Sequence, residues 1–251
     1  MKVDLLLPTS LSEIPLSRYQ DFIAMKEKSN DEEFIAQKMI QIFCGIKLNE
    51  VAKIQMKYLN ELITHFTDVF SERPQLIRKF KIKNVEFGFI PKLDDITLGE
   101  YVDIENYLES WETYHKAMAV MFRPIKNTNK DKYQIVDYEP SEDMQDLMRF
   151  APLDVAISAS VFFWTLGNEL VQATLSYLEK EMKKNKTLAT TFQKQLNLQS
   201  DGDGINQYMQ SLKETLQSSM RLPDTNLLSV SPISPSKSKK TELNNDNLKE
   251  T

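Results

Sequence analysis

The chain has 251 residues and a formal net charge of -5, with charged side chains of both signs interspersed along it. This balance argues against a general nucleic-acid binder, which would need a basic surface. Only 6 glycines argue against a glycine-lined nucleotide site or a barrel with many tight turns, and the single Cys44 excludes an intramolecular disulfide.

The N-terminal region contains a signature of twelve residues that occurs again later. "LSEIPLSRYQDF" (Leu11–Phe22) and "LDDITLGEYVDI" (Leu93–Ile104) are identical at five positions. Each copy follows an apolar segment that ends in proline, Val3–Pro8 and Val85–Pro91, and we predict both segments as strands.

The signature predicts the start of a helix. Thr97 and Glu100 form a capping box, so a helix should begin near Leu98. Pro15 stands at the corresponding place in the first copy, and proline suits a first helical turn. We therefore interpret the shared apolar residues as core anchors: Leu11, Ile14, Leu16 and Tyr19 in the first copy, and Leu93, Ile96, Leu98 and Tyr101 in the second.

Helical periodicity follows each signature. The first copy continues with amphipathic segments at 31–46 and 48–70, and the second with segments at 105–125 and 152–184. This order predicts a duplicated strand–helix–helix unit, with one copy in residues 1–80 and the other in 81–184. Val3–Phe70 should then superpose on Val85–Leu178.

Two β-hairpins complete the expected fold. The alternating run from Leu76 to Pro91 turns at Lys83–Asn84. Within a predicted insertion at 123–150, "FRPI" and "YQIVDY" should pair across a polar loop. The fold class is therefore mainly α with small β-hairpins, that is, α+β.

The most apolar stretch is "AISASVFFWTLG", Ala156 to Gly167. It is shorter than the ~20 residues that span a bilayer, so we predict a buried helix and no membrane partner, with Trp164 mostly buried. At the N-terminus, Asp4 and Pro8 interrupt any signal-peptide apolar region.

The C-terminal part changes in composition. We predict helices within 185–220 and a disordered tail over 221–251, which is rich in Pro, Ser, Asn and Lys. The only apolar cluster of this tail is a candidate docking motif, with an inert linker as the alternative. Its residues are Leu227, Leu228, Val230 and Ile233.

Residues with catalytic or metal-binding potential are few. "SDGDGINQYMQ" lacks the charged first and twelfth positions of a calcium-binding EF-hand loop. Glu112 and His115 have a di-iron spacing but no second copy, so we interpret the histidines as residues at the core boundary. We therefore expect no metal, no cofactor and no enzymatic activity.

Methionine and aromatic residues suggest a binding role. Met118 and Met121, together with the aromatic run Phe162–Trp164, could form an adaptable groove for partner helices. The alternative is that all of them pack in the core.

The signatures, together with "HKAMAVMFRPI" and "PLDVAISASVFFW", resemble small helical proteins encoded among the tail genes of tailed bacteriophages. They are most similar to the tail or baseplate assembly-chaperone type, over roughly residues 3–220. The duplication and the long polar tail depart from that type.

This resemblance implies a non-catalytic protein of the host-cell cytoplasm. It would bind apolar helical segments of a long tail protein, of the tape-measure or baseplate-hub type, and self-association is a further expectation. The alternative is a structural virion subunit of the phage neck, tail or baseplate. No nucleic-acid partner is expected.

Overall fold

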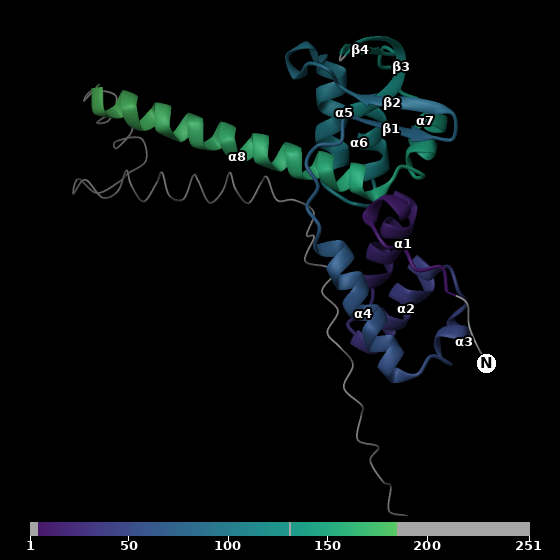
Figure 1. Ribbon diagram of the computed structural model, residues 1–251. Helices are drawn as coiled ribbons and strands as arrows, with labels where there is room; N and C mark the ends of the chain where they lie inside the picture. The colour runs from purple at the N-terminus through teal and green to yellow at the C-terminus, as the bar shows by residue number, and fades with distance from the viewer. Residues whose placement is uncertain (1–4, 131, 185–251) are drawn as a thin grey trace, which may run out of the picture.

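The computed structural model describes residues 5–130 and 132–184 (Figure 1). These residues form eight α-helices, two 3-10 turns and one four-stranded antiparallel sheet, so the predicted α+β class is confirmed. The predicted segments at 185–220 and 221–251 lie outside the described residues.

The first half of the described chain is helical. After the 3-10 turn η1 (Leu11–Glu13) come α1 (Leu16–Lys26), α2 (Glu32–Cys44), α3 (Leu48–Val51) and α4 (Met56–Ser71). The Asp31 side chain caps α2 by accepting bonds from two backbone N–H groups of the first turn, and Gly45 ends the helix at a φ of 68°.

The segment predicted as one helix over 48–70 is interrupted between α3 and α4. Backbone bonds from Lys53 N to Glu50 O and from Ile54 N to Val51 O tighten the chain into a turn there. The turn brings the half-buried Ile54 side chain onto the core, which explains the break.

The second half contains the sheet. Its elements are β1 (Lys79–Ile82), β2 (Val85–Phe89), the 3-10 turn η2 (Leu93–Asp95), α5 (Leu98–Leu108), α6 (Tyr114–Met121), β3 (Phe122–Asn129), β4 (Lys132–Ile135), α7 (Glu142–Met148) and α8 (Leu153–Lys184). The strand order is β1-β2-β3-β4, with consecutive strands antiparallel.

Both predicted hairpins are present. The polar loop predicted between "FRPI" and "YQIVDY" is wrong in extent, because β3 continues to Asn129 and β4 begins at Lys132. Lys83 turns the first hairpin with a φ of 52°, and the pairs Phe80–Phe87 and Ile125–Ile135 give the registers of the two hairpins. A Cβ atom on Gly88 would lie 2.4 Å from the Tyr133 ring, so β2 requires glycine where that ring crosses it.

One hydrophobic cluster extends through both halves. At their junction the rings of Tyr19 on α1 and Trp111 lie 4.8 Å apart with their planes nearly perpendicular. The Gln20 amide donates to Trp111 O at 2.7 Å and to His115 Nδ1 at 2.9 Å. Helix α1 therefore joins the helical half to the sheet-containing half.

Helix α8 is buried only at its beginning. Its first turns are in the core, whereas the rest projects from the body of the molecule (Figure 1). Trp164 is 43% exposed. The prediction that Trp164 is mostly buried is therefore wrong, because the helix leaves the core shortly after Ser160. Within the described ranges, no helix combines the length and apolarity needed to cross a bilayer.

The predicted duplication is visible only locally. Leu11–Lys26 and Leu93–Leu108 both form a 3-10 turn, one extended connection and an eleven-residue helix in the same register. The flanking elements differ, because the segment predicted as a helix over 105–125 divides into the end of α5, the helix α6 and the start of β3.

The strands predicted before the two signatures also differ. β2 pairs with strands on both sides, whereas residues 5–8 form no strand. Pro8 O instead accepts a hydrogen bond from His65 Nε2 on α4 at 2.8 Å. The strand predicted at Val3–Pro8 is thus wrong over its described residues. Duplication of the whole unit, like the boundaries at 80 and 184, stays a prediction.

Candidate partner-binding surfaces

The first signature is part of the core, as predicted. Its anchors Leu11, Ile14, Leu16 and Tyr19 are at most 1% exposed. They lie against the segment that enters α8, since Leu16 N donates to Ala151 O at 2.9 Å.

The second signature has a different environment. Leu93 and Ile96 are partly buried against the core, but Leu98 is 79% and Tyr101 57% exposed. The interpretation of Leu98 and Tyr101 as core anchors is therefore wrong. With the neighbouring Val102, which is also exposed, they form an apolar surface that we call the α5 face.

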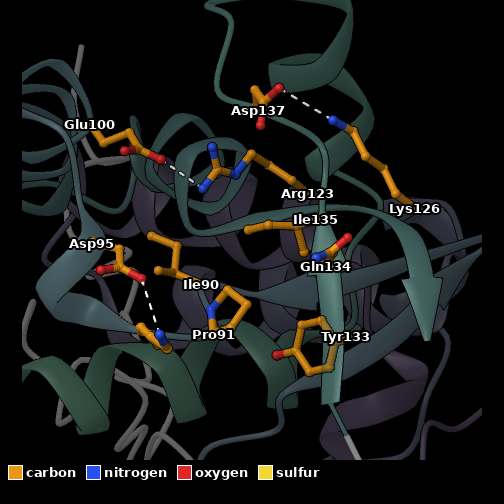
Figure 2. A pocket seen from close by; sticks show the side chains of 11 residues that line it. Ile90, Pro91, Asp95, Glu100, Arg123, Lys126, Tyr133, Gln134, Ile135 and Asp137 are labelled. Carbon is orange, nitrogen blue, oxygen red and sulfur yellow. Dashed lines mark hydrogen bonds and ion pairs between the residues drawn. The ribbon is translucent and has the colours of Figure 1, made fainter. Parts of the chain in front are cut away.

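A buried ion pair explains why α5 exposes this face. Glu100 points inward, and its carboxylate lies 2.6 Å from the Arg123 guanidinium of β3 (Figure 2). The second carboxylate oxygen accepts bonds from Thr97 N and Thr97 Oγ1, both at 2.7 Å, which completes the predicted capping box. Because Glu100 and Ile104 occupy the inner side of α5, Leu98 and Tyr101 lie on its outer side.

The network around Glu100 shifts the pKa values of its members. Burial alone would raise the pKa of Glu100, but the Thr97 hydrogen bonds and the Arg123 charge outweigh burial and lower it. Arg123 also lies over the Tyr138 ring, and Tyr138 donates to Asp103 at 2.6 Å. Burial and this bond to a carboxylate raise the pKa of Tyr138.

A cavity of about 500 Å³ opens beside this network (Figure 2). Six charged side chains line it, and they form three pairs: Lys92–Asp95 at 3.7 Å, Arg123–Glu100 at 2.6 Å and Lys126–Asp137 at 3.3 Å. The charged side chains that line the cavity thus neutralise one another in pairs. The buried pair of Glu100 and Arg123 links α5 to the sheet.

The predicted methionine groove is not an accessible surface. Met118 and Met121 are both 0% exposed on α6, so their assignment as partner-binding residues is corrected to core packing. Phe162 and Phe163 are half-buried, with their ring centroids 5.6 and 6.0 Å from that of Phe89. The docking residues predicted in the tail, Leu227, Leu228, Val230 and Ile233, lie outside the described residues.

The two histidines and the single cysteine are part of the packing of the fold. His115 is 9% exposed and bonded to Gln20, while His65 bonds Pro8. Cys44 is buried, and burial raises the pKa of its thiol to about 11. Across the described ranges, no three His, Cys, Asp or Glu side chains converge on a point where an ion could bind.

Helix α8 provides a second exposed apolar surface. Leu166 is 40% and Tyr177 63% exposed, and Ala173 between them is exposed as well. Steps of seven and four residues return to one side of a helix, so these three form a stripe, the α8 stripe. Sequence reasoning missed it because the apolar stretch Ala156–Gly167, which contains Leu166, was predicted to be buried, although the spacing of the three residues was visible in the sequence.

Family models, curated proteins and solved structures were compared with the chain, and none matched.

Proposed function

We propose that the protein is a non-catalytic assembly chaperone of a tailed bacteriophage, which binds apolar helical segments of a long tail protein during morphogenesis. The observation that carries this proposal is the α8 stripe on a helix that projects from the body of the molecule (Figure 1). The motif resemblance of the signatures and of the start of α8 supplies the biological context.

The chemistry of the stripe suits a helical partner. Leu166 and Tyr177 provide apolar and aromatic contact area at both ends, and the small Ala173 side chain lets a second helix come close. A partner helix would present apolar residues at matching intervals of three and four residues. The tail protein is proposed to be of the tape-measure or baseplate-hub type, met in the host cytoplasm.

The test is affinity capture from phage-infected cells with Leu166→Asp/Tyr177→Asp. The wild-type chain should retain the long tail protein, identified by mass spectrometry, and the double variant should retain at least about tenfold less, since a charge in each apolar contact costs more than 1.4 kcal/mol. The matched control is Gln172→Asp/Ser176→Asp, which alters exposed polar positions of the same helix. Equal capture by all three proteins would contradict the proposal.

The protein content of purified phage particles distinguishes the two roles that the resemblance implies, chaperone and structural subunit. A chaperone should be absent from finished virions, whereas a structural subunit of the neck, tail or baseplate should be present in fixed copy number. Finding the protein in particles would replace the chaperone proposal with the structural one.

A further inference from the structure

In the first signature, the segment before α8 forms backbone hydrogen bonds with the start of α1. Pro15 and Pro152 form an isolated antiparallel bridge. Leu16 N donates to Ala151 O at 2.9 Å, and Leu153 N donates to Ile14 O at 2.8 Å. Ser17 N donates to Arg149 O at 2.8 Å. The connection between α7 and α8, with Pro152 in the bridge, thus satisfies the first free N–H groups of α1.

The second signature presents the same three backbone groups without this cover. In the part of the chain that the structure describes, Ile96 O, Leu98 N and Gly99 N have no backbone partner outside α5. Thr97, at the place of Pro15, has its own N–H turned inward to Glu100. Ile96 O, Leu98 N, Gly99 N and the exposed Leu98 side chain therefore form an uncovered counterpart of the first bridge. We call this surface the second seat.

The chain itself contains a second segment with the character of the first occupant. Ala151–Pro152–Leu153 places proline between a small and an aliphatic residue. Among the 10 prolines of the chain, only Pro232 has comparable neighbours, in Ser231–Pro232–Ile233. The chain thus contains two signatures that can form such a bridge and two proline segments of this type. The first signature and Ala151–Pro152–Leu153 are already paired in the structure.

We propose that Ser231–Pro232–Ile233 of the same chain binds the second seat as an antiparallel bridge opposite Thr97. Leu98 N would donate to Ser231 O, and Ile233 N would donate to Ile96 O. Proline is favourable at the centre because the central residue of such a bridge directs its N–H away from the partner. Ile233 would place an aliphatic side chain opposite the partly buried Ile96, at the position that Leu153 has opposite Ile14 in the first bridge.

Chain length allows this pairing. The 32 residues of α8 rise by about 48 Å at ~1.5 Å per residue. Between Lys184 and Ser231 the sequence has 46 further residues, which span up to about 150 Å at ~3.3 Å each. The inference concerns the α5 face and does not depend on the α8 stripe or on the proposed function.

Amide hydrogen exchange of the full-length chain tests the pairing. Leu98 N–H should exchange at least about tenfold more slowly in the wild type than in Ile233→Asp, because the proposed bridge gives this first-turn group the acceptor Ser231 O. Leu248→Asp, a substitution of the same kind further along the chain, should leave the protection unchanged. The amides of Leu16 and Ser17 report that the fold is intact.

Three results would overturn the proposal. Equal exchange of Leu98 N–H in the wild type and in Ile233→Asp would show that Ile233 does not bind the second seat. Loss of protection in Leu248→Asp to the same extent would show an unspecific effect. Protection that grows with protein concentration would assign the segment to a second copy of the chain.

Discussion

The helices α1 and α5 have the same local fold and opposite environments. Both follow a 3-10 turn, both contain eleven residues, and both carry leucine and tyrosine at corresponding positions. Leu16 and Tyr19 have no exposed surface, whereas Leu98 and Tyr101 are mostly exposed. A short signature can therefore determine where a helix starts without determining which side of that helix is buried.

The difference arises at the third helical position. Glu100 of α5 forms the buried pair with Arg123, which turns that side of the helix inward. The corresponding Arg18 of α1 is only partly buried and donates to Phe43 O at 2.9 Å. One polar contact with a distant strand thus decides between a core helix and a helix with an apolar outer face.

Substitution of the matched leucines gives the largest expected contrast. Leu16→Asp places a carboxylate where no solvent reaches, at a cost of about 5 kcal/mol or more, which is comparable to the stability of many domains. We expect loss of the helical circular dichroism signal at 25 °C. Leu98→Asp should retain that signal, and unfolding of both variants would contradict the comparison.

Removal of the charge on Glu100 tests what orients α5. Glu100→Gln leaves Arg123 buried without its counter-ion and should lower the free energy of unfolding by about 3 kcal/mol in urea denaturation. Asp95→Asn is the matched control, because the Lys92–Asp95 pair is exposed and should contribute less than about 0.5 kcal/mol. Similar losses in both variants would show that the inner pair does not hold α5.

The smallest expected effect is a pH dependence of the contact between Gln20 on α1 and His115 on α6. His115 Nδ1 accepts the Gln20 amide proton, a contact that Val102 cannot make in α5. Burial, with the nearby charges of Arg149 and Lys116, lowers the pKa of His115 below its ordinary 6.5. The unfolded chain therefore binds more protons below pH 6.5, so stability should fall as the pH drops from 6.5 toward the lowered pKa.

Urea denaturation at pH 7.5 and at pH 5.5 measures this dependence. The wild type should lose stability at the lower pH, and His115→Asn should lose less. An identical loss in the two proteins would assign the effect to other groups.

Features that depend on near neighbours could be predicted from the sequence. The capping box of Thr97 and Glu100 and the turn at Lys83 involve residues at most three positions apart, and both are present. The burial of the first signature also followed from its apolar pattern.

Features that depend on distant contacts could not be predicted in this way. The inward orientation of Glu100 requires Arg123 on β3, and the exposure of Trp164 depends on where α8 leaves the core. An apolar run has the same pattern whether its helix continues through a core or projects from it. The two candidate binding surfaces are for this reason the parts that sequence reasoning missed.

The free energies of unfolding of Tyr19→Ala and Tyr101→Ala test most directly whether equal signatures have unequal environments. Tyr19 packs against Trp111 and has no exposed surface, so its truncation should cost about 3–5 kcal/mol. Tyr101→Ala should change stability by no more than about 0.5 kcal/mol, as is usual for exposed positions. Equal losses for the two substitutions, or a larger loss for Tyr101→Ala, would contradict the account.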